Sequence, residues 1–393
     1  MTMAPKNYRI CQCLLYGNFK EMARETVTAV LIQQQQQQIA LTQMTFYHKM
    51  AVDYFLPIMR QKRVDIPRVE NYYEVTIPRY SPDDFKSHFR LTRETFQSTC
   101  QRLSQTEEFN KLKGPTPNVE KDLLMFLWYI GNLKSYRSMA DRFGTSKGSF
   151  HLVAKRMSSA LAGIMPEVIK WPNTQADFIE TSREFSEKSQ FQNVVGAIDG
   201  CHIQIKALHH QPNAYYNRKI FHSIVLLGCC NAKMEFNYVW TGNPGSTHDA
   251  PVLRSSDLFQ NSNVKIPPGY YLLGDSAFPI LEWLITPFRD CGNLTRQQKL
   301  FNKTHSQCRQ VIERAFGMLK CRFRRLLRFD ISDISLLVDS VLAACVLHNL
   351  CLYEDDIFDL PDEDIVCNDD LFAREGHQLQ GIRIRQQLMN QLV

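Results

Sequence analysis

The feature that most constrains the fold is a change in hydrophobic periodicity near residue 190. Before it, apolar residues recur at helical spacing, whereas Val194–Lys206 is an apolar run with the pattern of a buried strand. Two further strand patterns follow at Ile220–Cys230 and Met234–Thr241, with a turn at Asn231–Lys233 between them. The remaining expected elements are a helix near Asp249, a strand at Tyr270–Asp275, a fifth strand at Ile280–Ile285, and helices at Thr304–Leu327 and Ile331–Tyr353. This order predicts an α/β fold in which helices flank a mixed sheet.

A helical block precedes the sheet, from about Ser81 to Leu161. Within it, Ala140, Gly144 and Val153 have the spacing of a helix-turn-helix, in which a small residue lets two helices approach and glycine forms the turn. Such folds meet bases and phosphates with polar residues at the start of the second helix, which here are Ser146, Lys147, Ser149 and His151. We expect Lys147 to contact DNA phosphates; the alternative is a helical hairpin that touches no DNA.

The domain organisation follows from these patterns and from the composition. A chain of 393 residues is long enough for two or three domains. Its first part contains six consecutive glutamines, Gln33–Gln38, and a short basic cluster at Arg60–Arg63. The predicted segments are a poorly ordered leader at residues 1–70, a small all-α helix-turn-helix-like domain at 71–165, a sheet domain at 190–353, and an acidic or polar tail at 354–393.

Charge is unevenly distributed, although the formal net charge is only +6. Leu300–Asp330 contains eight Lys or Arg and two acidic residues, whereas Tyr353–Asp370 contains nine acidic residues and no Lys or Arg. A basic segment of this kind favours a polyanionic partner, nucleic acid first. The alternative is two solvated surfaces of opposite sign.

The sequence does not favour a membrane span or a disulfide framework. Leu336–Tyr353 is apolar but is interrupted by Asp339, His348 and Asn349, which predicts a buried helix. No secretory signal is visible, and none of the twelve cysteines has Cys-x-x-Cys spacing. We therefore expect an intracellular protein with reduced thiols.

Three acidic residues lie next to apolar core segments. Asp199 interrupts the first strand, Asp275 closes the apolar run that starts at Tyr270, and Glu313 lies beside the apolar stripe of a late helix. A carboxylate in such a place is unfavourable unless a cation or a metal accompanies it. Converging at one sheet edge, the three would bind Mg²⁺ or Mn²⁺ through oxygen. Two such ions can activate a water or a 3′-hydroxyl and stabilise the leaving oxygen of a phosphodiester.

Other polar residues have more than one interpretation. Asp249 could orient a ligand or a water near the three carboxylates, or could simply cap the helix that follows Gly245. Arg309, Arg314 and Lys320 share a helix with Glu313 and could contact DNA phosphates.

Four ordered motifs resemble one family. They are Val195–Ile203, Pro244–Asp249, Leu273–Pro279 and Arg309–Arg324, and Leu347–Cys351 resembles the closing helix. Together they resemble the PIF/Harbinger DDE transposases, most of all the domesticated, nuclease-like branch.

The resemblance implies a ribonuclease-H-like DDE endonuclease domain at 190–353. In such a domain Asp199, Asp275 and Glu313 form a catalytic, metal-binding triad. The resemblance also implies a separate Myb-like/trihelix partner that supplies sequence recognition and nuclear import. We therefore expect the protein in the nucleus, and also in the cytoplasm.

These inferences favour a metal-dependent DNA endonuclease of transposase origin. One alternative is a catalytically silent scaffold that binds DNA or proteins, and another is an active transposase that joins strands. An unused carboxylate cluster would repel itself without metal, which argues against the scaffold. Metal affinity would separate the scaffold from the nuclease.

Overall fold

The computed structural model describes residues 7–55, 67–106, 118–188, 190–208, 211–358 and 378–392. The chain divides into two compact units, Met1–Pro67 and Arg68–Val393. The basic cluster Arg60–Arg63 and residues 359–377 of the acidic stretch lie outside the described residues.

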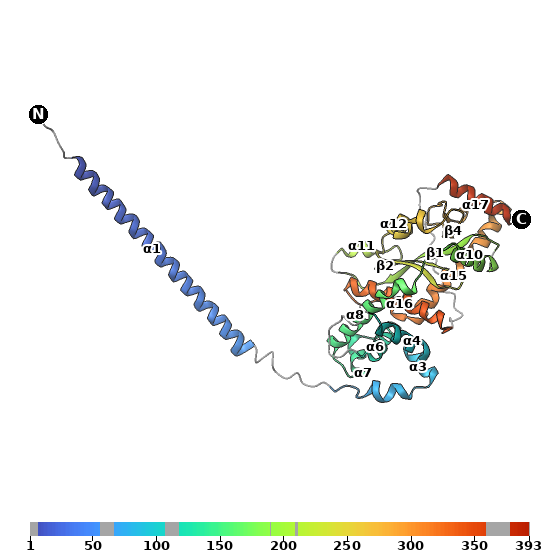
Figure 1. Cartoon of the computed structure of the whole chain (residues 1–393), viewed down its shortest axis with the longest axis horizontal. Helices are drawn as coiled ribbons and strands as arrows, with labels where there is room; N and C mark the ends of the chain where they lie inside the picture. The colour runs from blue at the N-terminus through green and yellow to red at the C-terminus, as the bar shows by residue number, and fades with distance from the viewer. Residues whose placement is uncertain are drawn as a thin grey trace. The chain divides into compact units, whose positions relative to one another are not determined.

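The first unit contains one long helix, α1 (Asn7–Met50), followed by the π-helical turn η1 (Ala51–Phe55) (Figure 1). This differs from the poorly ordered leader predicted for residues 1–70. Residues 18–50 contain no Gly or Pro, and Gln, Ala, Leu and Met are good helix formers. The Gln33–Gln38 run is therefore a continuous, exposed part of α1.

A five-stranded sheet forms the centre of the second unit, as predicted. Its order is β3-β2-β1-β4-β5. The β1–β2 and β2–β3 pairs are antiparallel, and the β1–β4 and β4–β5 pairs are parallel, so the sheet is mixed. The strands are β1 (Val194–Gln204), β2 (Ser223–Cys230), β3 (Phe236–Pro244), β4 (Tyr271–Leu273) and β5 (Leu284–Ile285). The predicted fifth strand is thus reduced to two residues.

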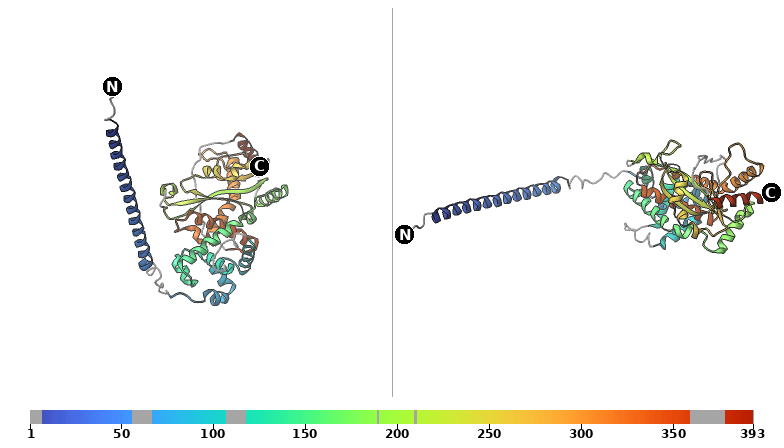
Figure 2. Two further views of the ribbon diagram at one scale, coloured as in Figure 1. Left: turned by 60° about the vertical axis from the view of Figure 1, so that its left-hand side comes forward. Right: turned by 90° about the horizontal axis from the view of Figure 1, so that it is seen from above.

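Helices cover both faces of the sheet (Figure 2). On one face, α15 (Arg296–Arg322) and α16 (Ile334–Tyr353) pack Ile312, Phe316 and Leu347 into a core with Ala197 and Cys201 of β1. On the other face, Val252 and Leu258 belong to a core with Ile198 and Leu227. They come from α12 (Asp249–Ser255) and α13 (Asp257–Gln260). The short helix α14 (Ser262–Lys265) follows, and α10 (Gln175–Lys188) precedes the sheet.

The helical block forms a helix-rich layer that starts with η2 (Tyr72–Thr76) and η3 (Ile77–Arg79). Its helices are α3 (Pro82–Phe89), α4 (Arg93–Ser104), α6 (Val119–Gly131), α7 (Tyr136–Arg142), α8 (Lys147–Gly163) and α9 (Met165–Val168). The side chains of Thr92, Ser135 and Ser146 cap α4, α7 and α8 by accepting a backbone N–H three residues on. Gly144 has φ 64° in the turn between α7 and α8, where only glycine is free of strain.

The helical block and the sheet share one hydrophobic core. Residues of α8 such as Ala154 and Met157 belong to the same buried cluster as Leu347 of α16 and Ile203 of β1. The segments predicted as domains at 71–165 and 190–353 thus pack together within one compact unit from Arg68 onward.

The C-terminal segment also packs into this body. The helix α17 (Leu379–Gln391) places Leu388, Met389 and the following Leu392 in a core with Tyr271 and Ile285. A segment expected as a polar tail thus covers the β5 edge of the sheet.

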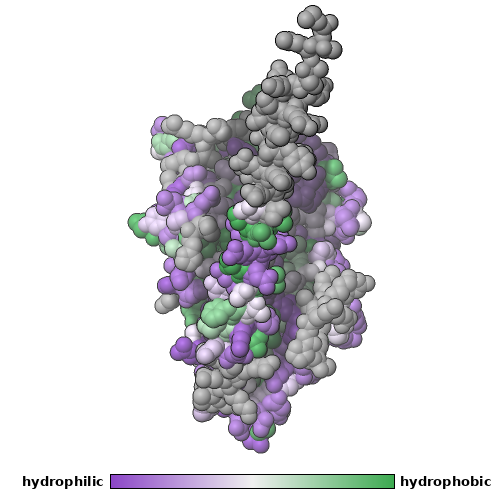
Figure 3. All heavy atoms as spheres, turned by 90° about the vertical axis from the view of Figure 1, so that its left-hand side faces the viewer, coloured by the Kyte–Doolittle hydropathy of each residue, from purple (hydrophilic) through white to green (hydrophobic). Residues whose placement is uncertain are grey.

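Among the described residues, α16 is the one helix long and apolar enough to span a membrane, and most of it is buried in the protein. This agrees with the buried helix predicted at Leu336–Tyr353. On the face drawn in Figure 3, the described surface is mainly hydrophilic, with scattered hydrophobic residues.

Candidate functional site

The site is built around Asp199 in the middle of β1. The Asp199 side chain is 8% exposed, and Oδ1 accepts a hydrogen bond from the backbone N–H of Gly200 at 2.8 Å. Its partner across the sheet is Gly228 of β2, where a methyl group would lie 2.9 Å from the ring of Phe316. Glycine at this position lets α15 lie close against the sheet, on the face to which Asp199 points.

Helix α15 supplies two further charged groups. Arg309 and Glu313 are one turn apart and therefore share a face of the helix. Nη1 of Arg309 lies 2.8 Å from Oδ2 of Asp199, and Nη2 lies 2.5 Å from Oε1 of Glu313. One guanidinium thus bridges a strand carboxylate and a helix carboxylate, with only 17% of the Arg309 side chain exposed.

Asp275 is brought level with Asp199 by the register of parallel strands. Ala197 of β1 pairs with Leu273 of β4, and each aspartate follows two residues later. Neighbouring strands are about 4.8 Å apart, so the two residues lie side by side where β4 ends. Oδ1 of Asp275 accepts the backbone N–H of Ala277 at 2.9 Å, which holds the turn after β4.

The electrostatics show an excess of negative charge. Burial is the main cause that raises the pKa of Asp199 to about 7; Arg309 opposes this rise, while the charges of Asp275 and Glu313 add to it. For Arg309, burial acts to lower the pKa, but the three surrounding carboxylates outweigh it and the pKa is raised. Three carboxylates surround one guanidinium, so a further positive charge would be favourable in this cluster.

The chemistry of these residues fits a divalent cation. Carboxylate oxygens are the ligands that Mg²⁺ and Mn²⁺ prefer, and the space between Asp199 and Glu313 already holds a cationic group. Within the described part of the chain, no three His, Cys, Asp or Glu residues are grouped closely enough to hold a metal ion. The guanidinium of Arg309 lies between the carboxylates of Asp199 and Glu313.

Asp249 lies on the other side of β1. It is the first residue of α12, and His248 holds the N-cap position that the helix-cap interpretation gave to Asp249. A methyl group built on Gly200 would lie 2.2 Å from Oδ1 of Asp249. Side chains alternate along a strand, so Gly200 faces away from the side to which Asp199 points. The structure therefore does not join Asp249 to the other three carboxylates.

The predicted phosphate contacts are scattered. Arg309 lies inside the carboxylate cluster, Arg314 is exposed on α15, and Lys320 donates to the backbone oxygen of His202 at 3.0 Å. Lys147 is exposed at the first turn of α8, in the helical block. The bridging position of Arg309 was not foreseen, although its distance of four residues from Glu313 was the available signal.

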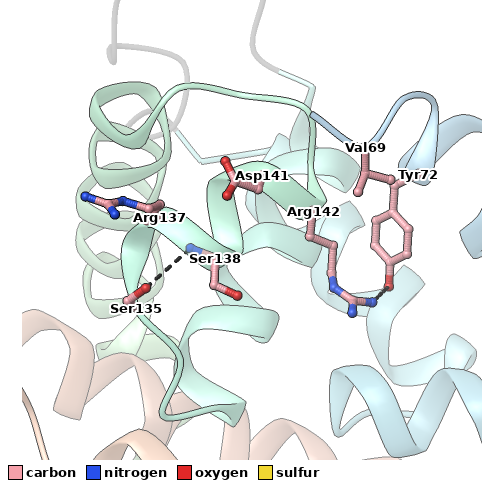
Figure 4. A pocket seen from close by; sticks show the side chains of 7 residues that line it. All are labelled: Val69, Tyr72, Ser135, Arg137, Ser138, Asp141 and Arg142. Atoms are coloured by element: carbon pink, nitrogen blue, oxygen red, sulfur yellow. Dashed lines mark hydrogen bonds between the residues drawn. The ribbon is translucent and has the colours of Figure 1, made fainter. Parts of the chain in front are cut away.

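A separate hollow of about 460 Å³ lies beside α7 in the helical block (Figure 4). Arg142 closes one side of it, donating from Nη1 to the hydroxyl of Tyr72 at 3.2 Å. Its lining residues are Val69, Tyr72, Ser135, Arg137, Ser138, Asp141 and Arg142. None of the three predicted metal ligands belongs to it.

Comparison with family models places a known domain over this site. Residues 198–349 match the model described as DDE superfamily endonuclease, which spans Asp199, Asp275 and Glu313. Residues 76–163 match a domain of unknown function, DUF8040, which coincides with the helical block. The sheet and its carboxylate cluster thus define a DDE endonuclease-like protein.

Individual relatives make the assignment narrower. "Putative nuclease HARBI1" of Homo sapiens is 31% identical over 280 residues, which cover 69% of this chain and 79% of that protein. The protein of the same name in Rattus norvegicus is 31% identical over 239 residues, covering 59% and 67%. "Protein ALP1-like" of Arabidopsis thaliana is 25% identical over 296 residues, covering 70% and 72%. No solved structure matches the chain. The chain belongs to the Harbinger transposase-derived nuclease family.

Proposed function

We propose that this protein is a divalent-metal-dependent DNA endonuclease with a ribonuclease-H-like core. The observation that carries the proposal is the Arg309 bridge between Asp199 of β1 and Glu313 of α15, with Asp275 following β4 in the same register as Asp199. The strand order 3-2-1-4-5, in which only β2 runs against the others, supports the ribonuclease-H-like assignment. The match to a DDE endonuclease model supports the chemistry.

Each residue has a part in this proposal. Asp199 and Asp275 would bind from adjacent strands, and Glu313 would bind from the facing helix. A bound divalent cation would supply the positive charge that activates a water and stabilises the leaving oxygen of the phosphodiester. Arg309 must release at least one carboxylate in this state, and its guanidinium would then be available to a phosphate oxygen.

The remaining parts of the proposal concern DNA and partners. The start of α8, with exposed Lys147, and the exposed Arg314 would contact phosphates. The protein would act in the nucleus, and also in the cytoplasm. A Myb-like/trihelix partner protein would recognise the target DNA sequence. A pull-down with the full chain as bait would test for such a partner. Addition of excess DNA duplex or of a partner fragment should reduce the amount of partner that is captured.

The test of the enzyme is cleavage of a DNA duplex at low salt with Mg²⁺ or Mn²⁺. We expect wild type to cleave and Asp275→Asn to lose cleavage together with the rise in melting temperature that Mn²⁺ gives to wild type. Asp330→Asn is the matched control, because Asp330 is exposed and its ion pair is with the exposed Arg328. Equal cleavage by Asp275→Asn and wild type would contradict the proposed site.

Two other functions remain as alternatives. The bridge from Arg309 to Asp199 and Glu313 favours a catalytically silent scaffold, because the guanidinium neutralises part of the cluster without metal. Such a scaffold would bind DNA but show no Mn²⁺-dependent stabilisation. An active transposase would give joined products as well as cut ones, since a 3′-hydroxyl would attack in place of water.

A further inference from the structure

A strained hairpin immediately precedes β2. In the segment Asn217–Phe221, the backbone N–H of Asn217 donates to the oxygen of Phe221 at 2.9 Å, and that of Ile220 donates to the oxygen of Asn217 at 3.1 Å. Ile220 has φ 67°, in the left-handed position that such hairpins normally give to glycine. A β-branched residue is strained in this conformation.

A second hairpin in the same chain shows how such strain can be compensated. Asn231–Glu235 has the same two backbone hydrogen bonds, and Met234 occupies the left-handed position with φ 69°. The Met234 side chain packs against the hydrophobic core, and its backbone oxygen lies 3.0 Å from Nε2 of His348. Tertiary contacts therefore hold Met234 in place.

Ile220 has no comparable burial. Its side chain is 76% exposed, in contrast to the half-buried Met234. Packing within the described part of the chain thus does not explain why an aliphatic residue occupies this glycine position. Strained backbone with an exposed side chain is more typical of a binding surface than of a structural turn.

Contacts with β2 and with the start of α12 hold the hairpin in place. Asn217 is 4% exposed and donates from Nδ2 to Oγ of Ser223 at 2.9 Å. Nη2 of Arg218 lies 2.6 Å from Nε2 of His248, the residue immediately before α12. The short helix α11 (Pro212–Tyr215) leads into the hairpin, and its Ala214 accepts a hydrogen bond from the backbone N–H of Ser246 at 3.3 Å.

The distance to the carboxylates suits a shared ligand. Ser223 pairs with Gln204 of β1, five residues beyond Asp199. At about 3.3 Å per residue this is roughly 16 Å along the strand, about the length of five base pairs of duplex DNA. A duplex bound at the carboxylates and running along β1 would span the distance to Ser223, at the foot of the hairpin.

The tip combines two cations with one aliphatic side chain. Arg218 and Lys219 are exposed directly before Ile220. Proteins that bend DNA use basic residues on the phosphates and insert an apolar wedge such as isoleucine between base pairs. We propose that Ile220 is a wedge that enters a base step of the DNA duplex, with Arg218 and Lys219 on the flanking phosphates. This inference rests on DNA as the substrate of the proposed function, but not on cleavage.

The experiment measures binding without cleavage. The full chain, in EDTA at low salt, is titrated into a fluorescein-labelled duplex, and into the same duplex carrying 2-aminopurine beside a flexible TA step. We expect wild type to bind and to raise the 2-aminopurine signal as the base unstacks. Ile220→Gly should bind at least fivefold more weakly and give no such rise, while its melting temperature increases by about 2 °C because glycine relieves the strain.

Two variants control for the fold. Ile220→Leu keeps an aliphatic tip and should retain both the affinity and the 2-aminopurine signal. Met234→Gly changes the matching position of the other hairpin and should lower the melting temperature without changing DNA binding.

The outcomes separate the wedge from the proposed nuclease. Equal affinity and equal 2-aminopurine signal in wild type and Ile220→Gly would overturn the wedge, even if wild type cleaves DNA. Absence of duplex binding by wild type would also overturn the wedge. So would the finding that the hairpin tip binds a protein in place of DNA. If wild type shows the 2-aminopurine signal but no metal-dependent cleavage, the wedge stands and the nuclease does not.

Discussion

Asp199 gives the most direct test of the site, because its charge should destabilise the metal-free protein. Folding raises the pKa of Asp199 from 3.8 to about 7, with burial as the main cause. Between these values the native state holds a proton that the unfolded state has lost, so stability falls as the pH rises through this window. A pKa rise of this size corresponds to roughly 4 kcal/mol in the free energy of unfolding.

The variant Asp199→Asn removes this titration while keeping the size of the side chain. Relative to wild type, we expect it to gain about 2–4 kcal/mol of stability between pH 5 and pH 8. The loss of some of the pairing with Arg309, which disappears with the charge, reduces this gain. Urea unfolding in EDTA, followed by tryptophan fluorescence, measures the difference. All four tryptophans lie in the second unit, so the signal reports on the body that contains the site.

Asp330→Asn serves as the control, because Asp330 is exposed and its ion pair with Arg328 lies at the surface. Its difference from wild type should stay constant with pH. If the stability curves of wild type and Asp199→Asn run parallel from pH 5 to pH 8, the reasoning about the buried carboxylate is refuted. Addition of Mn²⁺ at pH 8 should stabilise wild type and leave Asp199→Asn nearly unchanged.

Three further predictions concern the elements around the site. Replacing Arg309 with Met leaves buried carboxylates without their cation and should lower metal-free stability at pH 8 by about 3 kcal/mol, with little loss at pH 5; urea unfolding at both pH values checks this. Gly200→Ala places a methyl group 2.2 Å from the Asp249 carboxylate and should reduce stability by about 1–3 kcal/mol. Gly148→Ala, on helix α8, places its methyl group 3.9 Å from Oγ of the N-cap residue Ser146 and should be neutral or stabilising by thermal melting. Leu388→Ala should lower stability by about 2–3 kcal/mol in the same assay if α17 is part of the core, and an unchanged melting temperature would show that α17 is not.

The sequence predicts the sheet well because its strands are apolar runs with clear ends. Val194–Lys206 closely matches β1, and Ile331–Tyr353 closely matches α16. The fifth strand is less accurate, because only Leu284 and Ile285 pair with β4 and a strand of two residues leaves almost no periodic signal.

Tertiary contacts explain what the sequence does not predict. The shared core of α8 and α16 depends on helix faces that meet only in three dimensions, so a local pattern does not show that the two segments pack together. Likewise the sequence of α17 is polar in composition. One side of this segment is nevertheless buried, through Leu388, Met389 and the following Leu392. Local composition does not show whether a weakly apolar face finds a partner.

The carboxylates themselves are visible in the sequence for a physical reason. Asp199 is conspicuous because a charge is unfavourable in an apolar strand, and Asp275 because it follows one. Arg309 has the opposite character, since an arginine on a helix is ordinary and only the fold shows that it faces Asp199. Sequence reasoning therefore detects unfavourable charges more readily than the groups that compensate them.

Arg309 also changes the argument about catalysis. Three carboxylates alone would repel one another, so an intact triad would be expected to persist only where a metal is bound. With a guanidinium 2.8 Å from Asp199 and 2.5 Å from Glu313, part of that repulsion is relieved inside the chain. The intact triad is then compatible with a stable metal-free protein, and the choice between nuclease and scaffold depends on whether a divalent cation can displace Arg309 from the carboxylates.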